Sequence, residues 1–246
     1  MVDVIHALSG SAIAFGVATA VFFVWARSFS KSTRRYGYIA TLAGGAMAVT
    51  YVLIVAVDIQ YGADTDLIRF LGYTFMWLPI LYLLCAVAGV GRQLALALTA
   101  IVLGRVWITL VSWYLDGILS TIATLLPFVL LAAGIYLLFG PFSRIAGTRS
   151  RERALLFDKL KYLVVLGWLG LVGSGLISAD ALGLTDEFVG QISVMYVELI
   201  LVVGFVGIVL RRAEALEDIA ESGGFLASES VETLERTDYA ESETAD

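Results

Sequence analysis

Cysteine, histidine and lysine are all scarce in this chain, and each shortage excludes a kind of site. Among 246 residues there is one cysteine, Cys85, so no disulfide framework can form. The single histidine, His6, has no second histidine or cysteine near it, and we expect no metal site. The sequence also lacks a glycine-rich phosphate loop, a nucleophile elbow and an HExxH motif. We therefore expect neither an enzyme nor a protein that binds nucleic acid.

Charged residues are also few, at 15% of the chain against 59% hydrophobic residues, which excludes an ordinary water-soluble globule. We predict a multi-pass protein of the cell membrane, with the lipid bilayer as its surroundings. Polar breaks divide the apolar sequence into segments of about the 20 residues that a membrane-spanning helix needs. The seven predicted helices lie at about residues 4–26, 37–60, 67–90, 93–115, 118–140, 160–181 and 187–210.

Basic residues gather in alternate loops, which predicts the orientation because lysine and arginine accumulate on the cytoplasmic side. The loops after the first, third, fifth and seventh segments carry Arg27, Lys31, Arg34, Arg35, Arg92, Arg144, Arg149, Arg151, Arg153, Lys159, Lys161, Arg211 and Arg212. The other loops carry Asp64, Asp66, Asp116, Asp186 and Glu187. We predict an N-terminus outside and a C-terminus in the cytoplasm. The first segment lacks a basic stretch before it, so we interpret it as a retained helix and not as a signal peptide.

The chain divides into a membrane domain, residues 1–212, and an acidic tail, residues 213–246. The tail holds 11 acidic residues and one base, Arg236, and we expect it to be largely disordered in the cytoplasm. Its first dozen residues could instead continue the seventh helix as far as Gly223. It either docks a partner or serves as a solvating tail suited to high salt, and its acidity resembles that of haloarchaeal proteins. The fifth loop, SRIAGTRSRERALLFDKLK, is expected to extend the helices on either side of it and could contact anionic lipid.

Three ionisable residues fall inside the predicted helices: Arg69, Arg105 and Glu198. A charge in hydrocarbon is unfavourable, so each is expected to face the bundle interior and find a partner. Glu198 lies about 16 Å and Arg69 about 5 Å from the same end of their helices, at 1.5 Å of rise per residue. A long arginine side chain closes much of that difference. We therefore predict an Arg69–Glu198 couple, formed directly or through water.

The seventh helix is expected to face the interior with one side, which is read in steps of three and four residues. That side carries Gln191, Met195, Glu198, Val202 and Phe205. Aromatic residues that could line the same space are Tyr51, Tyr73, Trp77, Trp107, Trp113, Trp168 and Tyr196, although packing explains them equally well. Three glycines on the sixth helix, Gly167, Gly170 and Gly173, indicate close helix packing or, alternatively, a cavity.

Four stretches resemble the microbial, or archaeal, rhodopsins: KSTRRYGYIATLAGGAMAVTYVLIV, IRFLGYTFMWLPILYLLCAVAG, YLLFGPFSRIAG and VELILVVGFVGIVLRR. The resemblance covers residues 4–212 and implies an all-α bundle of seven transmembrane helices. It places Arg69 on the family's arginine below the chromophore, Glu198 on its helix-seven counterion and Tyr51 on a tyrosine beside that centre. It also places Tyr73, Trp77 and Trp168 around the retinal pocket and brings Arg105 toward the chromophore's ring.

Two positions depart from the family. The lysine that would form the retinal Schiff base is replaced by Val202, and the helix-three counterion is replaced by Gly72. A Schiff base requires a primary amine, and the three lysines, Lys31, Lys159 and Lys161, lie in or beside predicted cytoplasmic loops. We therefore expect no covalent retinal in the core and no photochemistry of the family's kind.

Three hypotheses of function follow. In the first, an opsin-related protein without its lysine has a signalling role or interacts with a membrane transducer, a cytoplasmic partner or a second copy of itself. In the second, Arg69, Glu198 and Arg105 form the polar path of an ion transporter or channel. In the third, the old pocket binds retinal or a carotenoid without a covalent bond.

Overall fold

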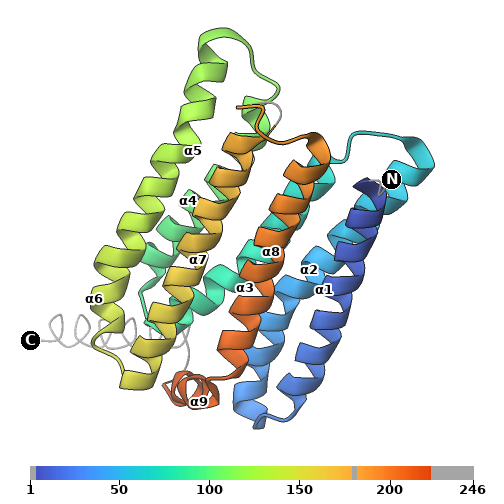
Figure 1. The fold of residues 1–246 in the computed structure, drawn as a ribbon. Coiled ribbons are helices and arrows are strands. Elements are labelled where there is room, and N and C mark those ends of the chain that lie inside the picture. The colour runs from blue at the N-terminus through green and yellow to red at the C-terminus, as the bar shows by residue number, and fades with distance from the viewer. Residues whose placement is uncertain (1–3, 179–181, 223–246) are drawn as a thin grey trace, which may run out of the picture.

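The computed structural model describes residues 4–178 and 182–222, and there the chain forms a bundle of long helices (Figure 1). Seven helices are long and apolar enough to cross a membrane, as predicted. Their bounds are α1 Val4–Arg27, α2 Lys31–Tyr61, α3 Asp66–Ala88, α4 Arg92–Ser112, α5 Gly117–Leu137, α7 Arg151–Ile177 and α8 Glu187–Leu210. A π-helix, η1 Leu138–Phe142, and the short α6 Ser143–Ala146 continue α5, and α9 Ala213–Glu221 follows α8.

The fifth predicted loop is mostly helix. The fifth span continues through Ala146, and α7 begins at Arg151, where the Ser150 side chain accepts a hydrogen bond from the Arg153 N–H. The extension of both flanking helices is therefore confirmed. The π-helix contains Pro141, which lacks the N–H that an α-helical hydrogen bond needs, and the Ser143 hydroxyl donates to the Leu138 carbonyl at 2.8 Å.

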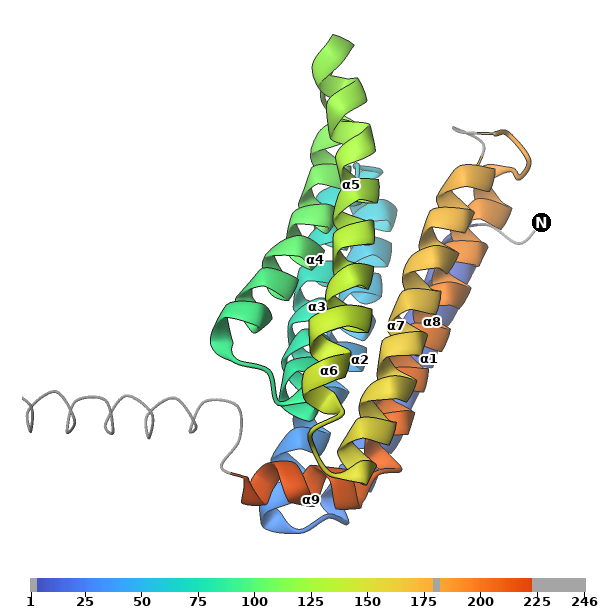
Figure 2. The same cartoon turned by 90° about the vertical axis from the view of Figure 1, so that its left-hand side faces the viewer.

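Each of the helices α1 to α5 packs against the next, and α8 closes the bundle by packing against α1, α2 and α7. Helix α3 is the most buried span and packs against α2, α4 and α7 (Figures 1 and 2). Two of the three glycines on α7 allow close contact with α8. A β-carbon at Gly167 would lie 3.0 Å from the Leu201 side chain, and one at Gly170 would lie 3.0 Å from Val197, whereas Gly173 faces open space. Packing therefore accounts for two of the three glycines.

Helix α9 lies across one end of the bundle (Figures 1 and 2). It buries Ala215, Leu216 and Ile219, and it contacts α2, α3, α7 and α8. The expectation of a largely disordered tail is wrong for residues 213–221, because three apolar side chains spaced along one helical face give that segment a surface to bury. It is also not a continuation of α8, since the backbone breaks helical geometry at Arg212, where φ is −118° and ψ is 55°. The rest of the predicted tail, residues 223–246, lies outside the described residues.

Polar contacts tie α9 to this end of the bundle. Arg212 Nη1 lies 3.2 Å from Glu152 Oε2, and the Ser150 hydroxyl donates to Asp218. Arg153 is almost fully buried and donates to the carbonyls of Ala86 and Val87 at the end of α3 and to the Ser222 hydroxyl. We call this the basic end, because it also holds the arginines of the first, third, fifth and seventh predicted loops. The opposite, acidic end holds the aspartates at positions 64, 66, 116 and 186.

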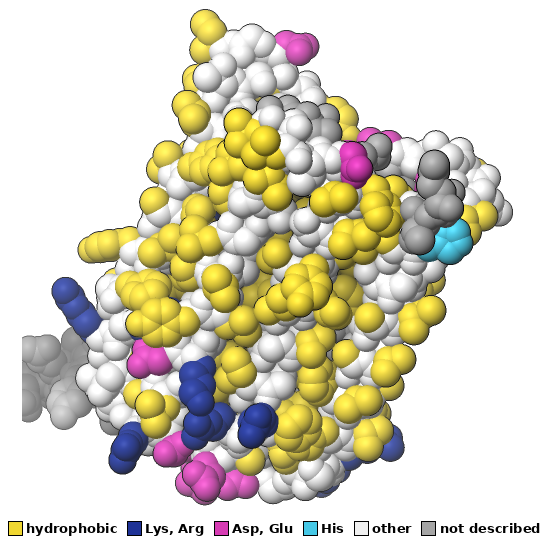
Figure 3. Space-filling model, viewed as in Figure 1, with side chains coloured by type: hydrophobic (Ala, Val, Ile, Leu, Met, Phe, Trp, Pro, Cys, Tyr) yellow, Lys and Arg dark blue, Asp and Glu magenta, His cyan; other side chains and the backbone are white. Residues whose placement is uncertain are grey.

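The bundle surface is apolar along its length and charged toward its ends (Figure 3). On α1 alone, Ile13, Val17, Val21 and Val24 are each more than half exposed. Such a surface is unfavourable in water and suits lipid, since lipid tails are themselves apolar. The chain is therefore a multi-pass, all-helical membrane protein.

Candidate functional site

The buried carboxylate of the bundle is Glu198 on α8, whose side chain is 1% exposed. The predicted inward side of this helix is confirmed: Met195, Glu198, Val202 and Phe205 are all buried, and Gln191 is half-buried. The three- and four-residue steps between them match the helical repeat, so all five lie on one face of α8.

Two tyrosines from other helices hold this carboxylate. Tyr51 on α2 donates its hydroxyl to Oε2 of Glu198, and Tyr73 on α3 donates its hydroxyl to Oε1. The ring of Phe15 on α1 stacks on Tyr51 with ring centroids 5.7 Å apart, which fixes the direction of that hydroxyl. Both carboxylate oxygens therefore have a donor, and α2, α3 and α8 are joined at one point. We call these residues, with Arg69 and Gln191, the Glu198 centre.

Arg69 lies near this carboxylate without forming an ion pair with it. Its Nη1 donates to Oε1 of Gln191 at 2.9 Å, and its charge is close enough to interact with Glu198, Tyr51 and Tyr73. Its Nε and the Gln191 Nε2 are buried and have no hydrogen-bond partner. The salt bridges among the described residues are Lys161–Asp158 and Arg212–Glu152, so the direct form of the predicted Arg69–Glu198 couple is not present. A couple bridged by water stays a prediction.

Gly72 lies where the resemblance expects the helix-three counterion, and the Thr50 side chain of α2 occupies the space beside it. A β-carbon at Gly72 would lie 2.1 Å from the hydroxyl oxygen of Thr50 on α2 and 2.4 Å from its methyl carbon. Thr50 also donates to the Ala46 carbonyl at 2.7 Å, which holds its side chain in place. Helices α2 and α3 thus approach so closely here that no side chain fits at position 72, and an aspartate would require them to separate.

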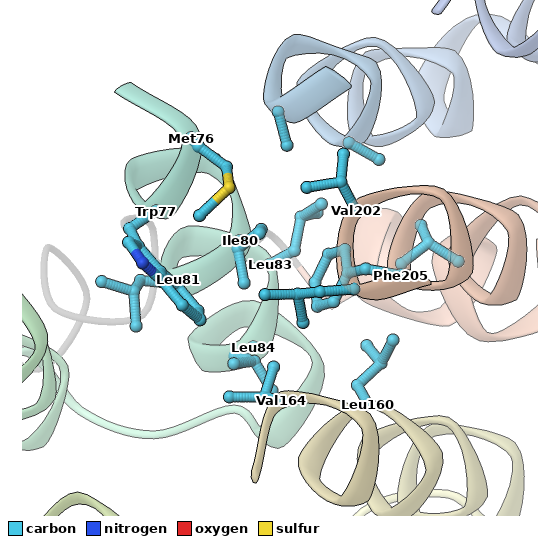
Figure 4. Close-up of a cluster of buried hydrophobic side chains, with 14 of the residues drawn as sticks. Met76, Trp77, Ile80, Leu81, Leu83, Leu84, Leu160, Val164, Val202 and Phe205 are labelled. Carbon is cyan, nitrogen blue, oxygen red and sulfur yellow. The ribbon is translucent and has the colours of Figure 1, made fainter. Parts of the chain in front are cut away.

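Val202, where the resemblance expects the Schiff-base lysine, is packed among apolar side chains (Figure 4). Its side chain is 1% exposed. Figure 4 shows it among side chains from α3, α7 and α8, and we call this cluster the apolar plug: Met76, Ile80, Leu83, Leu84, Leu160, Val164, Val202 and Phe205. All eight are buried. The residues here do not fit a covalently bound retinal, since valine supplies no amine and the surrounding volume is filled.

Lys161 is placed differently from the prediction, which put it in or beside a loop. It lies ten residues into α7 and is 5% exposed. Its ammonium bonds to Asp158 at 2.7 Å and to the Ser143 hydroxyl at 2.8 Å, and it faces the rings of Phe139, Phe157 and Tyr162. The amine is therefore engaged at the seam between η1 and α7. Lys31 and Lys159 are exposed, as expected of residues near loops.

The two pocket tryptophans pack against each other. The ring centroids of Trp77 on α3 and Trp168 on α7 are 5.8 Å apart, and both residues are 2% exposed. Trp168 also lies against Gly134 on α5, where a β-carbon would come within 3.2 Å of its ring. Two of the residues that the resemblance places around the retinal pocket are therefore in contact with each other.

Arg105 stands apart from the Glu198 centre. It lies between α4, α5 and α7 beside Ile101, Val102, Leu130, Leu131 and Trp168, and these residues leave no room for a water molecule. Within residues 4–178 and 182–222 its side chain makes no hydrogen bond or ion pair. The structure therefore brings together Arg69, Tyr51, Tyr73 and Glu198 from the predicted set but leaves Arg105 in a site of its own.

Two pairings within the site were not predicted from the sequence, although both residues were named. Gln191 as the partner of Arg69 could have been found by depth, because the two residues lie four and three positions from the same end of their helices, at about 6 and 5 Å. Tyr73 was predicted only as a pocket-lining aromatic. Its hydroxyl direction depends on the close approach of α2 and α3 at Gly72, and the sequence carries no signal for that.

Neither a protein-family model nor a curated protein matches the chain in sequence. Solved structures do match its fold. The thermophilic rhodopsin from Rubrobacter xylanophilus superposes with a TM-score of 0.80 at 19% identity, over 89% of this chain and 100% of that one. A cyanorhodopsin from the cyanobacterium Tolypothrix superposes with a TM-score of 0.81 at 16% identity, over 89% of this chain and 99% of that one. Halorhodopsin, a light-driven chloride pump, superposes with a TM-score of 0.75 at 19% identity, over 88% of this chain and 98% of that one. The chain therefore has the microbial-rhodopsin fold.

Proposed function

We propose that this rhodopsin-fold protein works in the membrane without covalent retinal, in signalling or in contact with a protein partner. The observation that carries the proposal is the closed core around Glu198. Its carboxylate is satisfied by Tyr51 and Tyr73, Thr50 fills the space beside Gly72, and Val202 belongs to the apolar plug. A photochemical switch of the rhodopsin kind needs a linked chromophore and a proton acceptor. Val202 supplies no amine for the link, and Gly72 supplies no acceptor.

The basic end offers the surface for such a partner. Helix α9 packs against four helices of the bundle, and its outward side carries the exposed residues Glu214, Glu217 and Glu221. A shift of α7 or α8 would move α9 through the contacts of Arg153 with Ser222 and of Arg212 with Glu152. Such a small two-state displacement is how helical receptors pass a signal to a neighbour. The proposed cytoplasmic orientation places this surface inside the cell.

Photo-crosslinking in native membranes tests the partner. A photoreactive amino acid replaces Glu217 on α9, and in a matched control it replaces Asp116, which is exposed at the acidic end. We expect a discrete crosslinked product from position 217 that is absent from position 116. Only intramolecular crosslinks from both positions, together with a monomer after mild solubilisation, would count against a partner. Crosslinking to a second copy of this chain would identify the partner as a homo-oligomer.

Ion transport is the second candidate, favoured by the polar residues Gln191, Arg69 and Glu198 between the acidic end and the middle of the bundle. This row of polar residues ends at Glu198. From Glu198 to Leu210, about 18 Å along α8, the buried side chains of that helix are all apolar, and α3 buries no charged side chain at the same depth. A proton pathway generally needs a chain of ionisable groups.

Flux in proteoliposomes separates the two candidates. We expect no proton or chloride flux above that of protein-free vesicles, from either the unaltered chain or a Glu198→Gln variant. Flux that the variant abolishes would replace the signalling proposal with a transport function. Non-covalent retinal or carotenoid is disfavoured by size, because the space beside Arg105 has no room for a water molecule, whereas pockets for drug-sized ligands provide roughly 300 Å³ or more.

A further inference from the structure

The turn between α1 and α2, at the same end of the bundle as α9, carries positive charge that its own helices do not balance (Figure 1). Arg27 ends α1 and Lys31 begins α2, and both side chains are exposed. The sequence has no aspartate or glutamate from residue 4 to residue 57. In the part of the chain that the structure describes, neither Arg27 nor Lys31 belongs to an ion pair. Their charges are therefore available to an anion from outside the protein.

The other two cations of this turn are held by the protein itself. Arg34 donates twice to the Phe29 carbonyl, from Nε at 3.3 Å and from Nη2 at 3.0 Å. Arg35 donates to the Tyr36 hydroxyl at 2.7 Å, and its guanidinium lies over the ring of the same tyrosine. These two arginines therefore stabilise the turn, which leaves the first two cations for a ligand.

An aromatic pair brings the two available cations onto one surface. Phe23 of α1 stacks on Tyr38 of α2 with ring centroids 5.0 Å apart, and the Arg27 guanidinium lies 5.0 Å from the centre of the Phe23 ring. Lys31 precedes Tyr38 by seven residues, about two helical turns, so both lie on the same face of α2. The faces of α1 and α2 that meet through the two rings each carry a cation at the basic end.

The surroundings of these cations favour a lipid as the source of the anion. Val21 and Val24 are both more than half exposed, so acyl chains can lie along α1 next to Arg27. Aromatic rings such as Phe23 and its partner are typical of the boundary between hydrocarbon and headgroups. The first turn of α2 contains no acidic residue and receives no side-chain cap, so its free N–H groups add to the positive potential.

The fifth loop, the other basic segment, is engaged largely within the protein. Arg149 donates to the Gly89 carbonyl at 2.6 Å, and Arg153 donates to two carbonyls of α3. The exposed cations Arg151 and Lys159 each adjoin a carboxylate in the sequence. The lipid contact that the sequence suggested for the fifth loop is therefore better supplied by the turn between α1 and α2.

We propose that Arg27 and Lys31 bind the phosphate of an anionic phospholipid, whose acyl chains lie along α1 beside Phe23. The guanidinium supplies paired N–H donors to two phosphate oxygens, and the ammonium adds a second charge-assisted hydrogen bond. A free phosphate ion shares this chemistry but lacks the acyl chains. The proposal is independent of the signalling role, since it involves neither the Glu198 centre nor the outward side of α9.

Scintillation proximity with radiolabelled dioleoylphosphatidylglycerol and the full-length protein in detergent micelles tests the proposal. We expect unlabelled phosphatidylglycerol to compete about tenfold better than zwitterionic phosphatidylcholine, because two cations at a lipid surface contribute on that order. The double variant Arg27→Gln/Lys31→Gln is expected to lose this preference. The matched control is Arg151→Gln/Lys159→Gln, which removes one arginine and one lysine from exposed positions of the fifth loop and should keep the preference.

Glycerol 3-phosphate and inorganic phosphate form the second arm as soluble competitors. We expect neither to displace the labelled lipid, and displacement by either would assign the site to a soluble phosphate and overturn the proposal. Equal weakening by the two double variants, or weakening by neither, would also overturn it.

Circular dichroism and a single elution peak establish that each variant folds. If Arg27→Gln/Lys31→Gln does not fold, Phe23→Leu decides, because it removes the ring beneath Arg27 and keeps both charges. We expect this variant to bind phosphatidylglycerol about threefold more weakly, since a cation–π contact at an exposed site contributes on that order. Unchanged binding would then contradict the proposal.

Discussion

The hydrogen bonds of Glu198 give the sharpest quantitative prediction, because each tyrosine can lose its hydroxyl with little change of shape. Tyr51→Phe leaves Oε2 of Glu198 without a donor, and Tyr73→Phe leaves Oε1 without one. Each bond joins α8 to a different helix, α2 in the first case and α3 in the second. The loss should therefore appear in the stability of the whole bundle.

Two general ranges bracket the unfolding free energy that each variant should lose. Hydrogen bonds to a charged group contribute about 1.5–3 kcal/mol, whereas those between membrane helices average about 0.6 and reach about 1.7 kcal/mol. The Glu198 side chain is 1% exposed, so little water can replace the lost donor and the value should fall where the ranges meet. We expect each variant to lose about 1.5 kcal/mol of unfolding free energy, which is close to a tenfold change in the unfolding equilibrium. Since both bonds end on one carboxylate, the double variant should lose more than the sum.

Equilibrium unfolding by SDS in mixed micelles, followed by circular dichroism, measures these losses. Tyr196→Phe is the matched control, because Tyr196 lies on the same helix as Glu198 and is 64% exposed. Its effect should stay within about 0.5 kcal/mol. If Tyr51→Phe and Tyr73→Phe both fall within the range of this control, the Glu198 centre does not join the helices and the argument for a closed core fails.

Two further changes test the packing at the centre and at the basic end. Gly72→Ala should destabilise by about 1–3 kcal/mol in the same assay through overpacking against Thr50, whereas Gly173→Ala, which faces open space, should be neutral or stabilising by up to about 1 kcal/mol. Equal effects from the two glycines would refute the close approach of α2 and α3. Arg153→Gln should lose about 2–3 kcal/mol and increase hydrogen exchange in α9, because its three donors join α3 and α9, while the exposed Arg151→Gln should do neither. Unchanged exchange in α9 would show that Arg153 does not hold it.

Much of this fold could be predicted from the sequence, because a membrane-spanning helix is a long apolar segment bounded by polar residues. The spans near residues 4–26 and 187–210 are reproduced almost to the residue, and the fifth loop extends the helices on either side of it as expected. A helix at residues 213–221 was expected only as an alternative that continues the seventh helix, because the charge of the segment indicates disorder and its three buried side chains find a surface only once the basic end is assembled. Whether an acidic amphipathic segment folds depends on what lies beside it.

The candidate site was predicted in its members and missed in its pairing. Tyr51 and Glu198 were expected at one centre, and they share a hydrogen bond there. Arg69 was paired with Glu198 on grounds of charge, although Gln191 lies at its own depth and takes its hydrogen bond. Opposite charges attract over a distance, but hydrogen bonds require contact, and contact depends on how close the helices pack.

The central proposal is that this rhodopsin-fold protein functions without covalent retinal, and it depends on the absence of a lysine at position 202. The direct measurement adds all-trans retinal to the purified protein, records the visible spectrum, and locates any borohydride-trapped retinyl adduct by mass spectrometry. Val202→Lys and the amine-free Val202→Met are measured beside it. We predict no red-shifted band and no core adduct in the unaltered chain. Because the apolar plug fills the space, we predict none in either variant. A visible pigment in the unaltered chain with a retinyl adduct on Lys161, its buried amine among the described residues, would contradict the account.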